Sequence, residues 1–115
     1  MDYSQLSDFE INKRVAEVIY KDRDGLFVAR NPPSREEVTI VAEVNSEDIC
    51  LAAADYCNNP ADAWPIIVDN RIGINHVNEV WRAQSMKTGW EEFSDDNPLR
   101  AAMIVFLMIQ DAKHA

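Results

Sequence analysis

The first apolar positions of the chain have the spacing of one helix face. Four of them follow the i, i+4, i+7, i+8 pattern, namely Ile11, Val15, Val18 and Ile19. Ser7 and Glu10 precede this run at the spacing of a capping box, in which each side chain accepts a hydrogen bond from a backbone N–H at the other end. The pattern predicts a helix over residues 8–20, ended by turn residues at 22–25.

Two later stretches share a helix start, an asparagine followed by a proline. Asn59-Pro60 and Asn97-Pro98 combine an N-cap residue with a proline whose missing N–H costs nothing at the first helical position. Pro65 is expected to bend the first of these helices or to divide it into two short pieces. The second is predicted to run to about residue 113. Because it is apolar nearly all round from residue 101 to 109, we expect it to be the central core helix or part of a subunit interface.

Strand patterns occupy much of the remaining chain. A short strand is predicted at 26–30, stopped by the turn residues 31–34, and a strand with alternating polarity at 38–44. Residues 73–77 and 80–83 resemble a hairpin, residues 46–57 fit either a helix or a strand, and residues 88–96 are interpreted as a polar connection. The elements together predict an α+β fold over a single domain, residues 1–115. Three helices are expected to pack on one small, largely antiparallel sheet of three or four strands.

The net charge of the chain restricts the classes of molecule that it is expected to bind. Eleven Lys and Arg residues against 20 Asp and Glu give a net charge of −9, which disfavours direct binding to nucleic acid. The longest apolar run, 101–109, is shorter than the roughly 18–20 residues that span a bilayer. The N-terminal residues lack the basic and apolar regions of a signal peptide. We therefore expect a cytoplasmic protein that does not act on membranes.

The two cysteines do not form a metal-binding pattern. Cys50 and Cys57 are seven residues apart, and His76 and His114 add no paired spacing, so no structural zinc site is expected. We interpret both cysteines as free thiols that are buried or partly buried. No cofactor-binding motif is present either, and the chain is expected to hold no cofactor.

Three long stretches suggest a family. They are residues 1–12 (MDYSQLSDFEIN), 55–68 (DYCNNPADAWPIIV) and 97–108 (NPLRAAMIVFLM). In this order and at these distances the chain resembles the NinX-like proteins of lambdoid phages and prophages in enteric bacteria. The resemblance implies a short, phage-encoded protein in the cytoplasm of the bacterial host. The family has no assigned biochemical activity, so no catalytic residue is carried over.

The strongest candidate site is the segment around the Asn59-Pro60 helix start. It brings together an aromatic ring, amides, a carboxylate and a thiol, and we select Tyr56, Asn58, Asp62 and Trp64 as candidate binding residues. Helix N-termini bind anions through their free backbone N–H groups. The alternative is purely structural: Asn59 caps the helix, Asp62 complements the helix dipole, and Trp64 belongs to the core.

The tryptophans offer a second candidate site. Trp64, Trp81 and Trp90 could contribute to a recognition surface, since tryptophan is enriched at interaction hot spots. Three tryptophans in so small a domain are more typical of core or half-core positions. Trp90 stands in a polar stretch beside Glu91 and Glu92, and is therefore the best candidate for an exposed binding residue.

Three functions remain open. The first is a non-enzymatic phage accessory protein that binds a host or phage protein; whether it is a monomer or a homodimer through the final helix is left open by the sequence. The alternative is a nucleic-acid-linked role in phage recombination, either indirect or as an acidic DNA mimic. A small hydrolase using Cys57 and His76 is the third, although no activating signature accompanies these residues.

Overall fold

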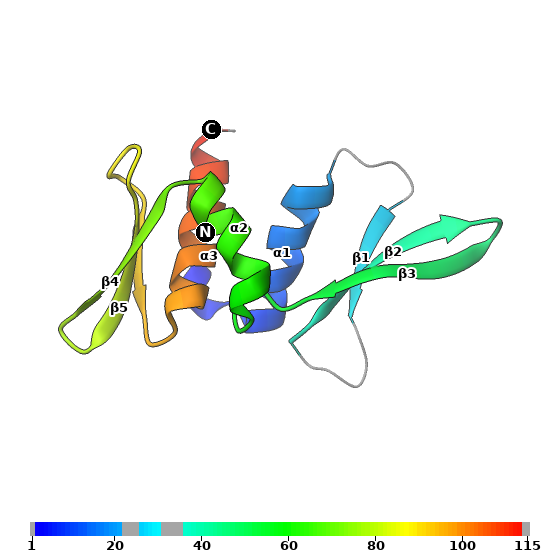
Figure 1. Cartoon of the computed structure of the whole chain (residues 1–115), viewed down its shortest axis with the longest axis horizontal. Helices are drawn as coiled ribbons and strands as arrows, with labels where there is room; N and C mark the ends of the chain where they lie inside the picture. Colours follow the sequence, from blue (N-terminus) through cyan, green and yellow to red (C-terminus); the bar gives the residue numbers. More distant parts are fainter. Residues whose placement is uncertain (1, 22–25, 31–35, 114–115) are drawn as a thin grey trace. The chain divides into compact units, whose positions relative to one another are not determined.

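The computed structural model describes residues 2–21, 26–30 and 36–113 (Figure 1). The predicted turn at 22–25 and the predicted strand stop at 31–34 lie outside these residues. The chain divides into two compact units, an N-terminal unit of residues 1–55 and a C-terminal unit of residues 56–115. Each has its own helix and sheet elements.

The helix of the N-terminal unit matches its prediction. A 3₁₀ helix, η1 (Tyr3–Gln5), is followed by α1 (Asp8–Tyr20). The Ser7 and Glu10 capping box is present: the Glu10 N–H donates to Ser7 Oγ at 3.1 Å, and the Ser7 N–H donates to Glu10 Oε1 at 3.4 Å. Before η1, hydrogen bonds from the Ser4 hydroxyl and backbone N–H lower the pKa of Asp2.

One three-stranded antiparallel sheet accompanies α1. Its order is β1 (Leu26–Arg30), β2 (Val38–Val44) and β3 (Glu47–Ala54). The first two strands are confirmed, and the ambiguous segment 46–57 is a strand as far as Ala54. This segment is a strand because Asn45 and Ser46 form a two-residue hairpin turn, which pairs β3 antiparallel to β2. Both turn residues have positive φ, as such turns require. Beyond β1, the β2–β3 hairpin continues alone (Figure 1).

A buried asparagine fastens α1 to the sheet of this unit. Asn12 is fully buried, and its Nδ2 donates to the Glu36 backbone carbonyl at 2.7 Å and to Asp55 Oδ1 at 2.8 Å. The Glu36 carboxylate in turn accepts from the Phe9 N–H at 3.1 Å in the first turn of α1. The residues that enter β2 and leave β3 are thus joined to one helix.

The C-terminal unit contains α2 (Pro60–Asp69), β4 (Ile72–Val77), β5 (Val80–Ser85), β6 (Glu92–Asp95) and α3 (Pro98–Lys113). The predicted hairpin is confirmed, and its turn residues Asn78 and Glu79 have positive φ. Strand β6 was missed, because it is four residues long and only Phe93 and Asp95 in it are partly buried. Pro65 was predicted to bend α2 or to divide it; the helix continues through Pro65, so it is not divided, and the bend stays a prediction.

The final helix is the core of its unit. Every residue from Ala101 to Leu107 is buried, and α3 packs against β4, β5, β6 and α2. Of the two alternatives for this helix, the core position is therefore the observed one. The α+β class and the three helices are confirmed. The described strands form two three-stranded sheets rather than the single sheet that was predicted. In one sheet β3 pairs with β2, and in the other β6 pairs with β5.

Candidate functional site

The helix start at residue 59 is built as its sequence predicts. Asn59 caps α2, with its Oδ1 accepting a hydrogen bond from the Ala61 N–H at 3.0 Å, and Pro60 occupies the first helical position. Asp62 lies partly buried in the first turn, where its charge meets the positive end of the helix dipole. These observations match the structural interpretation of Asn59 and Asp62.

Asn97 links this helix start to that of α3. Its Oδ1 accepts from the backbone N–H groups of Leu99 at 2.9 Å and Arg100 at 3.3 Å, which caps α3. Its Nδ2 donates to the Cys57 carbonyl at 2.7 Å and to Asn58 Oδ1 at 3.2 Å. Sequence reasoning recognised Asn97 only as a cap. The recurrence of Asn-Pro at both helix starts was the signal that pointed to this position.

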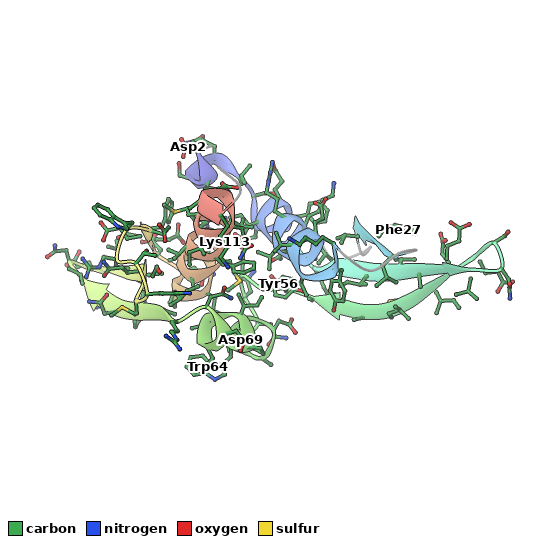
Figure 2. All side chains as sticks on the ribbon, turned by 90° about the horizontal axis from the view of Figure 1, so that it is seen from above. Asp2, Phe27, Tyr56, Trp64, Asp69 and Lys113 are labelled. Atoms are coloured by element: carbon green, nitrogen blue, oxygen red, sulfur yellow. The ribbon has the colours of Figure 1, made fainter. Side chains whose placement is uncertain are left out.

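The selected residues of this segment have different environments. Tyr56 and the neighbouring Cys57 are buried, Asn58 is exposed, and Asp62 is partly buried. Trp64 is 62% exposed on α2, and Figure 2 shows its ring on the outer side of the helix. Two cavities of the structure, of about 390 Å³ and 480 Å³, are lined by other residues. Of the four, the accessible groups are the Asn58 amide and the Trp64 indole.

The expectation of a core or half-core position is wrong for Trp64, whereas the predicted exposure of Trp90 is confirmed. Trp64, Trp81 and Trp90 are 62%, 36% and 84% exposed. Trp81 packs its ring against His76 on the adjacent strand, with ring centroids 4.9 Å apart. The buried residues of α3 include Ile104, Val105 and Phe106.

Trp90, the most exposed of the three, stands on a loop that is tied down by hydrogen bonds. The Trp90 N–H donates to Thr88 Oγ1 at 3.1 Å, and that hydroxyl donates to Glu91 Oε1 at 2.8 Å. Gly89, with φ +78°, gives the loop a backbone conformation that side chains disfavour. The indole is therefore exposed on an ordered backbone.

The base of this loop is fixed to the end of β5. The Ser85 N–H donates to the Glu91 carbonyl at 2.8 Å, and the Gly89 N–H donates to the Ser85 carbonyl at 2.9 Å. The Gln84 side chain adds a bond from its Nε2 to the Gly89 carbonyl at 3.1 Å. We call residues 86–91 the Trp90 loop.

A cavity of about 390 Å³ adjoins the Trp90 loop, since Thr88 and Glu91 are among its lining residues. Its charged lining has both signs, from Asp69, Glu91, Arg71, Lys87 and Lys113. Such a cavity can accept hydrogen-bonding groups of a partner beside an aromatic contact. Met86, whose exposed side chain lies over Gly73, adds apolar surface at the start of the loop; sequence reasoning did not select it.

The structure offers little support for a hydrolase that uses Cys57 and His76. Cys57 is fully buried, whereas Cys50 on β3 is exposed, so the expectation of a buried or partly buried thiol is wrong for Cys50. The reason is that β3 is uncovered on its outer side. Within the described part of the chain, no group of three or more His, Cys, Asp or Glu side chains could hold a metal ion.

Comparison with known proteins supports the resemblance. The model of the family described as "Bacteriophage P22, NinX" matches residues 2–110 and so spans both units. The chain belongs to the bacteriophage P22 NinX family. No curated protein and no solved structure matches the chain. Of the helices described in this NinX family member, none has the length and apolar character to cross a membrane.

Proposed function

We propose that this NinX family member is a non-enzymatic phage accessory protein that binds a host or phage protein, with Trp90 as the central contact. The supporting observation is an indole that is 84% exposed on a hydrogen-bonded loop. Tryptophan is the residue type most enriched among binding hot spots. A loop that is ordered before binding loses less conformational entropy when a partner docks.

The surroundings of Trp90 fit a protein partner. Glu91, the next residue in the chain, lines a cavity together with Arg71 and Lys87, so this loop combines an exposed apolar ring with nearby charged groups. We place this activity in the cytoplasm of the bacterial host cell, in keeping with the family's phage origin. The whole chain, residues 1–115, is proposed to act as one domain.

Affinity capture tests the proposal. Tagged wild type, Trp90→Ala and Trp64→Ala are incubated with lysates from infected and uninfected host cells, and the captured proteins are quantified by mass spectrometry. Trp64→Ala is the matched control, because it removes another exposed indole from the same unit. We expect a specific partner to be retained by Trp64→Ala and reduced at least about tenfold by Trp90→Ala. Equal capture by Trp90→Ala, or no specific partner in either lysate, would contradict the proposal.

A gel-shift at low salt separates this function from direct nucleic-acid binding. On α1, the cations Lys13 and Arg14 share one surface depression with Glu10 and Glu17, so the acids offset them locally. Together with the net charge of −9, this predicts no shift of single- or double-stranded DNA. A clear shift would favour the nucleic-acid-linked alternative.

A further inference from the structure

One cavity of the C-terminal unit collects the cations that no acid of the described residues neutralises. The unit contains five Lys and Arg residues and eight Asp and Glu residues. Arg82 is in an ion pair with Glu92 at 4.0 Å, and Arg100 is in an ion pair with Asp95 at 3.4 Å. The three remaining cations have no ion-pair partner among the described residues, and all three line the cavity of about 390 Å³: Arg71, Lys87 and Lys113.

The charges of the cavity lining indicate the charge of a matching ligand. Asp69 and Glu91 are its two acids, so the lining with its three cations has a net charge of +1. Glu91 is already held within its own loop, because Thr88 Oγ1 donates to Glu91 Oε1 at 2.8 Å. A single carboxylate would neutralise the lining, whereas a phosphate dianion would leave it negative. Hydrogen bonds from Arg and Lys to a carboxylate are roughly twice as strong as those between neutral groups.

Part of the cavity wall is apolar. Ile109 and Ala112 lie three residues apart on α3, and therefore on one face of that helix. Lys113, four residues after Ile109, shares this face. A ligand that places a carboxylate among the cations can thus set a short alkyl chain against α3. The volume of about 390 Å³ is in the range of sites for small molecules.

Arg71 occupies a backbone position that favours glycine. It directly follows Asn70, the C-cap of α2, and its φ is +51°. Glycine is the usual residue at this place, because a Cβ disfavours the left-handed backbone conformation. The Arg71 carbonyl accepts from the Met86 N–H at 2.8 Å, which fixes Arg71 to the start of the loop that carries Lys87. The backbone does not explain an arginine here, and its guanidinium has no described carboxylate to bind.

We propose that this cavity binds a monocarboxylate with a short alkyl chain. Arg71, Lys87 and Lys113 hold the carboxylate, and the alkyl chain packs on Ile109 and Ala112. A free organic acid and a glutamate side chain of another protein carry the same chemistry, and the experiment distinguishes these two sources. The proposal stands without a protein contact at Trp90.

Titration of the ¹⁵N-labelled full-length chain with sodium butyrate, at constant ionic strength, tests the proposal by NMR. We expect saturable shifts of the backbone amides of Arg71, Thr88 and Lys113, with a Kd of about 1–10 mM, as is reasonable for a ligand of so few atoms. Butanamide, the neutral analogue, should cause no such shifts, and inorganic phosphate should bind more weakly than butyrate. Absence of these shifts, equal shifts with butanamide, or tighter binding of phosphate would overturn the proposal.

Arg71→Gly separates a binding role from a structural one. Glycine suits the φ of +51°, so the variant should melt at or above the temperature of wild type while its affinity for butyrate falls about fivefold or more. Lys87→Gln leaves that backbone position unchanged and should also weaken butyrate binding. Lys13→Gln is the matched control, since it removes one positive charge from the N-terminal unit and should bind as wild type does. Wild-type affinity in both Arg71→Gly and Lys87→Gln would overturn the proposal.

N-acetylglutamate amide identifies the source of the carboxylate, because it presents the side chain as a protein would. Binding tighter than that of butyrate would support a glutamate of another protein, and weaker binding would support a free organic acid. Trp90→Ala should bind butyrate as wild type does. Loss of partner capture and loss of butyrate binding are therefore separate results, and failure of one proposal is distinguishable from failure of the other.

Discussion

Asn97 Nδ2 donates a hydrogen bond to the Cys57 carbonyl at 2.7 Å, and so joins the start of α3 to the turn before α2. The same side chain caps α3 through its oxygen. Sequence capping rules account for the oxygen, but not for the amide nitrogen, because its acceptor lies 40 residues away. One side chain therefore has a local and a long-range role that mutations can separate.

Asn97→Ala removes both roles, and we expect it to lower the free energy of unfolding by about 2 kcal/mol. Asn97→Asp keeps an acceptor for the cap but loses the donor, and should cost about 1 kcal/mol. Asn59→Ala, which removes only a cap, serves as the comparison at about 1 kcal/mol. Urea denaturation measures all three. Asn97→Asp as stable as wild type would show that the bonds from Nδ2 add nothing.

Asn12 is the corresponding buried amide of the N-terminal unit. Asn12→Ala removes the donor to the Glu36 carbonyl and to Asp55, and should destabilise by about 2–3 kcal/mol. Asn12→Asp should be worse at pH 7, because it sets a second carboxylate against Asp55. Repulsion raises the pKa of such a pair, so the stability of Asn12→Asp should recover as the pH falls. Urea denaturation at pH 7 and pH 5 tests this, and a pH-independent loss would contradict it.

The elements that follow local rules were predictable, and those that depend on distant partners were not. Helix α1 matched its prediction because its cap and its apolar face lie within one segment. The sequence left β3 undecided between a helix and a strand, because its run of alanines favours a helix and its strand structure depends on pairing with β2. Strand β6 was not predicted, because it is defined by pairing with β5. The exposure of Trp90 was predicted from its polar neighbours Glu91 and Glu92, whereas the exposure of Trp64 depends on which face of α2 packs on the rest of its unit.

The two cysteines should differ in reactivity. A maleimide added to the folded protein should label Cys50 rapidly and Cys57 only after unfolding, because Cys57 is fully buried. Labelling of one cysteine therefore does not by itself support a hydrolase. Only labelling of Cys57 would support it. Cys50→Ala is the control and should stay unlabelled without urea, as mass spectrometry will show. Fast labelling of Cys57 in that variant would restore the Cys57–His76 hypothesis.

Gly89 provides a test of the Trp90 loop that leaves the indole in place. A Cβ added at Gly89 meets no atom within 4 Å, but the φ of +78° disfavours alanine. Gly89→Ala should therefore lower the free energy of unfolding by about 1 kcal/mol and weaken partner capture. Gly89→Asn, which tolerates this backbone region better, should lie closer to wild type in both measurements. If Gly89→Ala binds the partner as wild type does, the loop conformation does not position Trp90, and the exposed ring alone would account for binding.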